Sequence, residues 1–277
     1  MIHPEISGNK WRKLRLNFEK FKHGKYERIV TFGGAFSNHI AAVAALGKSE
    51  NIPTLGIIRG DELNAESNET LSRAMYNGMQ LKFVSRDEYA MRYERIYHEE
   101  LRNEFGNILL IEEGGANHLG VLGIADCIKE LPFLPGYIYT AAGTGTTAAG
   151  LLLATEKTKI VSVPVLKNGG FLKDEIERML QLILFDEDLT QEKMQFLQME
   201  TDFHFGGYGK FTTELINFIN ETYQQYQIKF DQIYTAKMLY AFIENIKSGK
   251  INSNSTVVLL HTGGLQGLTS IKDQLIF

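Results

Sequence analysis

Short strand-like runs alternate with helical runs along most of the chain, and this alternation constrains the fold more than any other feature. The strand-like runs are continuous apolar segments rich in β-branched residues, and the segments between them repeat apolar residues at helical spacing. Strands that are buried on both faces and joined by helices form parallel sheets. The pattern therefore predicts an α/β protein with parallel-rich sheets covered by helices.

The expected elements follow one another closely. We predict strands at residues 28–31, 54–58, 80–84, 108–111, 137–140, 160–165 and 256–260. We predict helices at residues 37–48, 69–77, 87–105, 119–128, 147–154, 172–184, 213–226 and 236–246.

Composition and charge argue against several classes of protein. A chain of 277 residues with 44% hydrophobic content can bury a sizeable core, and its net charge of -4 leaves no broad basic surface for a nucleic-acid backbone. No apolar run approaches the roughly 20 residues that a membrane span needs. We therefore expect neither a nucleic-acid partner nor a membrane protein.

The cysteine and histidine content points to a cytoplasmic protein without a metal. Cys127 is the single cysteine of the sequence, so no internal disulfide can form, and it lies in an apolar helical pattern typical of a buried structural thiol. The N-terminal sequence lacks the features of a secretory signal. The seven histidines are scattered without metal-ligand spacing, so we predict no metal site.

Four clusters of glycine and polar residues follow predicted strands, where α/β proteins bind ligands. They are 33–39 (Gly-Gly-Ala-Phe-Ser-Asn-His), 114–117 (Gly-Gly-Ala-Asn), 143–147 (Gly-Thr-Gly-Thr-Thr) and 261–264 (His-Thr-Gly-Gly). In the third cluster, Gly143, Thr144, Gly145, Thr146 and Thr147 could hold a phosphate with backbone N–H groups and hydroxyls at a helix start. A glycine-rich turn that only packs a helix against the sheet remains the structural alternative.

Several single residues complete the candidate set, and each has a purely structural explanation as well. Lys10 follows Ser7-Gly8-Asn9 and precedes Trp11; apolar cover could lower its pKa for Schiff-base chemistry, although most lysines are simply solvated. Ser37, Asn38 and His39 could either cap a helix or contact a ligand. Tyr208 lies among glycines, and Tyr234 precedes a helix, but most tyrosines serve packing.

Together these segments resemble the family of 1-aminocyclopropane-1-carboxylate deaminases and D-cysteine desulfhydrases. These are tryptophan synthase β-like enzymes of fold type II, which depend on pyridoxal 5'-phosphate (PLP). The family's lysine motif is matched by residues 7–14 (Ser-Gly-Asn-Lys-Trp-Arg-Lys-Leu), its Ser-Asn-His motif by residues 37–39, and its glycine-rich bend by residues 113–117. The likeness covers nearly the whole chain. It implies a larger PLP-binding domain from residues 1–14 and 121–277, and a smaller inserted α/β domain from residues 15–120.

The resemblance also assigns roles to residues. Lys10 would bind PLP covalently, Asn38 would hydrogen-bond the pyridine 3-oxygen, Thr262 would pair with the pyridine nitrogen, and the backbone of residues 143–147 would hold the phosphate. Catalysis would fall to Lys10, Ser37, Tyr208 and Tyr234, and the substrate would contact Ser37, Asn38, His39, Tyr208 and Tyr234.

Two positions favour one activity within the family. The deaminases that open the cyclopropane ring carry glutamate directly after the tyrosine matched by Tyr234, and leucine where this chain has Thr262. This chain has Thr235 and Thr262, as on the D-cysteine desulfhydrase side. We therefore expect conversion of D-cysteine to pyruvate, sulfide and ammonia. The alternative is 1-aminocyclopropane-1-carboxylate deaminase activity, which gives 2-oxobutanoate and ammonia. Phe36 stands where glutamine is usual in the family, so this chain departs from the family's pattern at that position.

Other classes of function stay open at this point. A nucleotide-dependent α/β enzyme would use the loop at Gly143 but would not account for Lys10. A truncated or non-catalytic relative is the other alternative, because the family usually has an additional N-terminal segment before the lysine motif. By resemblance we expect a homodimer acting on a small amino acid.

Overall fold

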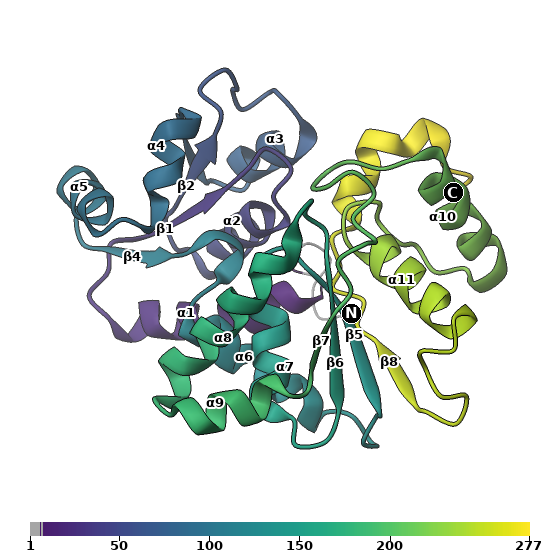
Figure 1. Ribbon diagram of the computed structural model, residues 1–277. Helices are drawn as coiled ribbons and strands as arrows, with labels where there is room; N and C mark the ends of the chain where they lie inside the picture. Colours follow the sequence, from purple (N-terminus) through teal and green to yellow (C-terminus); the bar gives the residue numbers. More distant parts are fainter. Residues whose placement is uncertain (1–5, 7) are drawn as a thin grey trace. The chain divides into compact units, whose positions relative to one another are not determined.

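The computed structural model describes Ile6 and residues 8–277, and it contains two parallel four-stranded sheets (Figure 1). The chain divides into two compact units, Met1–Gly120 and Val121–Phe277, each built around one sheet. The α/β class with parallel sheets is thereby confirmed. The grouping of residues 1–14 with residues 121–277 in one functional domain stays a prediction.

The first unit contains a sheet with the strand order β3-β2-β1-β4. Its strands are β1 (Arg28–Gly33), β2 (Thr54–Arg59), β3 (Gln80–Val84) and β4 (Ile108–Ile111). Its helices are α1 (Asn9–His23), α2 (Asn38–Glu50), α3 (Glu69–Tyr76), α4 (Arg86–Ala90) and α5 (Arg95–Phe105), with short 3-10 turns η1 (Met91–Tyr93) and η2 (Glu113–Gly115). Helix α6 (His118–Lys129) carries the chain into the second unit.

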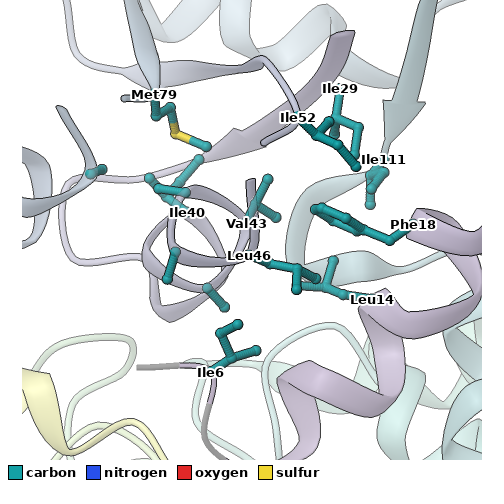
Figure 2. Close-up of a cluster of buried hydrophobic side chains, with 14 of the residues drawn as sticks. Ile6, Leu14, Phe18, Ile29, Ile40, Val43, Leu46, Ile52, Met79 and Ile111 are labelled. Atoms are coloured by element: carbon teal, nitrogen blue, oxygen red, sulfur yellow. The ribbon is translucent and has the colours of Figure 1, made fainter. Parts of the chain in front are cut away.

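Apolar side chains cover both faces of the first sheet. On one face, Ile29 and Ile111 from the strands pack with Leu14 and Phe18 of α1 and Leu46 of α2, all at most 5% exposed (Figure 2). Burying each of these side chains contributes about 1.5–3 kcal/mol to stability. This core holds α1 and α2, which carry the candidate residues of this unit, against the sheet.

The opposite face of the first sheet corrects one prediction. The single helix predicted over residues 87–105 is wrong, because α4 ends at Ala90 and α5 begins only at Arg95, with extended backbone at Glu94. The break lets Tyr89 of α4 and Tyr97 of α5 both pack against Phe32 of β1, with ring centroids 6.2 and 6.3 Å away. In one straight helix these tyrosines would lie about 80° apart around the axis.

The second unit contains a sheet with the order β7-β6-β5-β8. Its strands are β5 (Tyr137–Ala142), β6 (Lys159–Pro164), β7 (Leu197–Met199) and β8 (Val257–Leu259). Its further helices are α7 (Thr146–Ala154), α8 (Leu172–Leu184), α9 (Glu187–Met194), α10 (Thr213–Tyr226) and α11 (Thr235–Lys247), with 3-10 segments η3 (Gly169–Phe171) and η4 (Leu265–Gln274). Of these, α9, β7 and the two 3-10 segments were not predicted from the sequence.

Helices cover both faces of the second sheet as well. Ile160 of β6 packs with Leu152 of α7 and Ile176 of α8, whereas Val161, the next residue of the strand, packs with Met238 of α11. Figure 1 accordingly shows α7 and α8 on one side of the strands and α11 on the other. Alternate residues of a strand point to opposite faces, so one strand serves both cores.

In each sheet, the strand that comes first in the chain has later strands on both of its sides. The candidate loops follow this first strand and one of its neighbours. In the first sheet, β2 and β4 flank β1, and in the second, β6 and β8 flank β5. In open α/β sheets, ligands bind beyond the carboxyl ends of the strands at such a point. The topology therefore puts the glycine-rich loops after β1, β4, β5 and β8 where a ligand site is expected.

Two structural features are absent from residues 6 and 8–277. No helix in this part of the chain is both long enough and apolar enough to cross a membrane. Nor does it contain a group of three or more His, Cys, Asp or Glu side chains placed to hold a metal ion.

Candidate active site

Lys10 lies in the first turn of α1, two residues after Gly8, which precedes the helix. Gly8 has φ 62°, a left-handed conformation that glycine adopts without steric strain. Ser7, the first residue of the lysine motif, lies outside the described residues. Lys10 is half-buried, and burial lowers the pKa of its ammonium to about 8. At pH 7.5 about one such amine in four is neutral, against about one in a thousand for an ordinary lysine.

Lys13 is a second lysine of this site, which the sequence analysis did not single out. It follows Lys10 by three residues and therefore lies on the same side of α1. Its side chain is only 4% exposed, and burial together with the charge of Lys10 lowers its pKa well below the usual range. Its Nζ is 3.5 Å from the carbonyl oxygen of Gly114. The three-residue spacing on one helix was the available signal.

Ser37 and Asn38 begin α2, just after β1. The Ser37 hydroxyl accepts a hydrogen bond from the Ile40 N–H at 3.3 Å, so Ser37 caps the helix as its residue type favours. Asn38 is 8% exposed, and its buried Oδ1 has no hydrogen-bond partner among the described residues. Buried amide groups are nearly always paired in folded proteins. Asn38 therefore has hydrogen-bonding capacity available for a ligand.

His39 is held in one tautomer by Thr31 of β1. The Thr31 hydroxyl donates its proton to the carbonyl of Ile111 at 2.7 Å, so it must accept from Nε2 of His39 at 2.8 Å. Burial, followed by the charges of Lys10 and Lys13, keeps the pKa of His39 well below its usual value. The ring is therefore neutral, and its buried Nδ1 is an acceptor without a partner in the described part of the chain.

The glycine-rich bend after β4 packs against these side chains. Gly114 and Gly115 have φ 69° and 73°, and a Cβ on Gly115 would lie 3.3 Å from Cβ of Lys13 and 3.6 Å from Cε1 of His39. The first unit thus brings Lys10 and Lys13 close to His39, which follows Asn38 in the chain. We call Lys10, Lys13, Asn38 and His39 the lysine cluster. Its unpaired nitrogen and oxygen atoms, together with two lysines, suit a polar and anionic ligand.

The loop of residues 143–147 connects β5 with α7 in the second unit. Gly145 has φ 76° and precedes the helix, whose first N–H groups have no carbonyl partner within the helix. A Cβ on Gly145 would lie 2.7 Å from Cγ1 of Ile176, so only glycine fits. The hydroxyls of Thr144 and Thr146 lie 2.9 Å apart. This combination of free N–H groups, helix dipole and hydroxyls suits a phosphate.

Tyr208 and Tyr234 lie side by side in the same unit. Their hydroxyl oxygens are 3.4 Å apart and their rings meet edge to face, with centroids 6.0 Å apart. A Cβ on Gly143 would lie 3.5 Å from the Tyr234 hydroxyl, so this tyrosine borders the loop after β5. Both side chains are half-buried. The structure thus brings together two tyrosines and a glycine-rich loop that are far apart in the sequence.

Thr262 lies just beyond the carboxyl end of β8, the neighbour of β5, and is 9% exposed. Gly263 and Gly264 after it have φ 77° and 91°, and the Gly263 N–H donates to Nδ1 of His261 at 3.2 Å. The candidate residues therefore form two sets. The lysine cluster and Ser37 belong to the first unit, and the loop of residues 143–147, both tyrosines and Thr262 belong to the second.

Comparison with known proteins finds relatives over nearly the full chain. A putative 1-aminocyclopropane-1-carboxylate deaminase of Pyrococcus horikoshii is 27% identical over 98% of this chain and 84% of that protein. A bifunctional D-cysteine desulfhydrase/1-aminocyclopropane-1-carboxylate deaminase of Arabidopsis thaliana is 25% identical over 98% of this chain and 72% of that protein. No model of a known protein family matches the chain.

Solved structures show the same fold. The structure of an ACC deaminase homologue superimposes with a TM-score of 0.79, at 24% identity, over 98% of this chain and 84% of that chain. A serine racemase of Dictyostelium discoideum superimposes with a TM-score of 0.61, at 13% identity, over 94% and 84% of the two chains. The chain is thus similar over nearly its whole length to proteins named 1-aminocyclopropane-1-carboxylate deaminase and D-cysteine desulfhydrase, and it shares the fold of these solved structures.

Proposed function

We propose that this protein is a PLP-dependent lyase that converts D-cysteine and water to pyruvate, hydrogen sulfide and ammonia. The observation that carries the proposal is the Lys10 amine, whose pKa is lowered to about 8 by burial. In the same unit, the buried Oδ1 of Asn38 lacks a partner among the described residues. A lysine with a lowered pKa is the residue type that forms Schiff bases with carbonyl groups.

The described residues fit the functional groups of PLP. The Lys10 amine suits the aldehyde, and the unpaired Oδ1 of Asn38 can accept a hydrogen bond from the 3-hydroxyl. The helix start at Gly145, where a Cβ would collide with Ile176, suits the phosphate. Thr262, at the end of a neighbouring strand, offers a hydroxyl for the ring nitrogen.

PLP, when bound, takes up negative charge from the α-carbon of an amino acid and so lets the α-proton and a β-substituent leave. The Lys10 amine, with a pKa near 8, can hold and return a proton close to neutral pH. The hydroxyls of Tyr208 and Tyr234 can donate a proton or hydrogen bonds to the substrate. Thr262 can only hydrogen-bond and carries no charge, which favours elimination over transamination.

Thr235 supports D-cysteine over the cyclopropane substrate. It stands where the ring-opening deaminases are expected to carry glutamate, and it is fully buried. Its hydroxyl donates to Oδ1 of Asp231 at 2.6 Å and accepts from the Asp231 N–H at 2.9 Å. The Thr235 hydroxyl is thus used in hydrogen bonds at the start of α11, and threonine has no carboxyl group that could act as an acid. The names of the relatives keep ring opening of 1-aminocyclopropane-1-carboxylate as the alternative activity.

The first experiment tests the cofactor. The purified protein is mixed with PLP, its visible absorbance is recorded, and the adduct is reduced with borohydride and located by peptide mass spectrometry. We expect a yellow band, with the label on Lys10. Lys10→Ala should lose both, and Lys20→Ala, which changes an exposed lysine on the same helix, should keep both. A folded protein that binds no PLP at Lys10 would refute the proposal.

The second experiment tests the substrate. The PLP-loaded protein is assayed for sulfide and pyruvate with D-cysteine and L-cysteine, and for 2-oxobutanoate with 1-aminocyclopropane-1-carboxylate. We expect sulfide from D-cysteine at the highest kcat/KM. Production of 2-oxobutanoate without sulfide would instead support the deaminase alternative.

Three further points stay predictions. They are homodimer assembly, a cytoplasmic location, and a functional domain that joins residues 1–14 with residues 121–277. Light scattering of the purified protein tests the first of these.

A further inference from the structure

Lys237 is a lysine of α11 whose side chain has no contact with solvent. It is 0% exposed, and its Nζ donates hydrogen bonds to the carbonyl oxygens of His204 at 2.8 Å and Gly207 at 2.9 Å. Buried lysines are rare because desolvating the ammonium is costly, so such a group must make compensating bonds. The two carbonyls belong to the loop that ends at Tyr208.

Residues 204–207 of this loop form a tight turn with left-handed backbone, and Lys237 bonds the carbonyl groups at both ends of it. The His204 and Gly207 carbonyls each also accept a backbone N–H, from Gly207 at 3.0 Å and from Lys210 at 3.1 Å. Between them, Phe205 has φ 48°, which is an unfavourable conformation for a phenylalanine. Nζ of Lys237 thus bonds both of these carbonyls at once, directly before Tyr208.

The same helix holds Tyr234 at its start. The Asp231 carboxylate accepts the N–H groups of Ile233, Tyr234 and Thr235, each at 2.9 Å. This fixes the backbone of Tyr234 relative to α11. Lys237 follows Tyr234 by three residues. A single rigid helix therefore carries Tyr234 and also the lysine that bonds the loop before Tyr208.

We propose that Lys237 is a positioning residue that ties the Tyr208 loop to α11 and thereby keeps the Tyr208 and Tyr234 hydroxyls within 3.4 Å of each other. This inference rests on the proposed function, in which the two hydroxyls act on the substrate together. Lys237 itself touches neither hydroxyl in the contacts described, and it acts through the loop.

The first test needs no cofactor and no activity. Lys237→Met keeps most of the side-chain volume and removes the donors, and hydrogen exchange of the apoprotein is followed by mass spectrometry. We expect peptides spanning residues 204–210 to exchange about tenfold faster or more, because the loop opens locally, while peptides of α10 are unchanged. Lys247→Met, at the exposed end of the same helix, should change neither. Unchanged exchange in residues 204–210 of Lys237→Met overturns the proposal.

The second test asks whether the hydrogen bonds of Lys237 to the loop affect activity through Tyr208. Steady-state kinetics are measured for Lys237→Met, Tyr208→Phe and the double variant. We expect each single variant to lower kcat by about tenfold or more with smaller changes in KM, and the double variant to be little worse than Tyr208→Phe, because coupled residues are not additive. Additive losses would mean a merely structural role and would overturn the proposal.

The two proposals fail in different ways. If the wild-type protein shows no PLP-dependent turnover, the proposed function fails, and hydrogen exchange alone decides whether Lys237 ties the loop to α11. If Lys237→Met does not fold, Lys237→Leu replaces it, because leucine also removes the donors, on a shorter apolar side chain. It should give the same changes, and an unchanged loop would again overturn the proposal.

Discussion

The Thr31 hydroxyl and the His39 ring form a buried hydrogen bond of 2.8 Å whose direction is set by a third residue. Because Thr31 donates to the Ile111 carbonyl, His39 must donate from Nε2. One hydroxyl thus joins β1, β4 and the first turn of α2, and it leaves Nδ1 of His39 as the open acceptor.

Thr31→Val should lower the free energy of unfolding by about 2 kcal/mol or more. The substitution leaves the buried Nε2–H of His39 and the buried Ile111 carbonyl without their hydroxyl partner. Urea unfolding followed by circular dichroism measures the change. Thr140→Val is the matched control, since Thr140 is equally buried on β5 but, within the described part of the chain, its hydroxyl bonds only the adjacent Ala141 carbonyl, at 3.3 Å. Equal costs for the two variants would contradict the assigned network.

Ser37 has two expected roles, and two substitutions separate them. Ser37→Ala should lose about 1 kcal/mol of stability along with activity, because the N-cap is removed. Ser37→Asn should keep the cap and the stability but still lose activity, since no hydroxyl remains for the substrate. Ser85→Asn makes the same change at the cap of α4 and should keep full activity. An active Ser37→Asn would leave Ser37 with a structural role alone.

The pH dependence of cofactor capture follows from the lowered pKa of Lys10. Only the neutral amine attacks the aldehyde, so the rate of PLP capture by the apoprotein should rise about tenfold per pH unit below pH 8 and level off above it. Stopped-flow absorbance measures this rate, with a free lysine derivative as the reference, whose rate keeps rising toward pH 10.5. A protein rate that rises unbroken beyond pH 9.5 would show that burial does not lower the pKa.

Gly145→Ala should weaken PLP binding by at least tenfold and lower stability by about 1–3 kcal/mol, because alanine disfavours φ 76° and its Cβ collides with Ile176. Equilibrium titration with PLP and urea unfolding give the two numbers. Gly170→Ala is the control in the same unit, where a Cβ would meet nothing within 4 Å. Unchanged affinity in Gly145→Ala would argue against the phosphate role of this loop.

Local patterns predicted most of the fold. Strands β3 and β4 and helices α8 and α10 have the bounds expected from the sequence, because their periodicity and flanking residues are encoded within each segment. The break at Glu94 and the elements α1, α9 and β7 escaped prediction. The break depends on the contacts of Tyr89 and Tyr97 with Phe32, which is distant in the sequence. Strand β7 has only three residues, so it too depends on distant partners and not on local spacing.

The sequence by itself determined the α/β class, the loops that follow the strands, and the candidate residues that motif resemblance picked out, since all of these lie in short contiguous segments. Only the tertiary structure decided the lowered pKa of Lys10, the burial of Lys13, the 3.4 Å approach of Tyr208 to Tyr234 and the hydrogen bonds of Lys237 to the loop before Tyr208. Desolvation and hydrogen bonding depend on which residues meet in space, and chain folding brings together residues that local patterns describe separately.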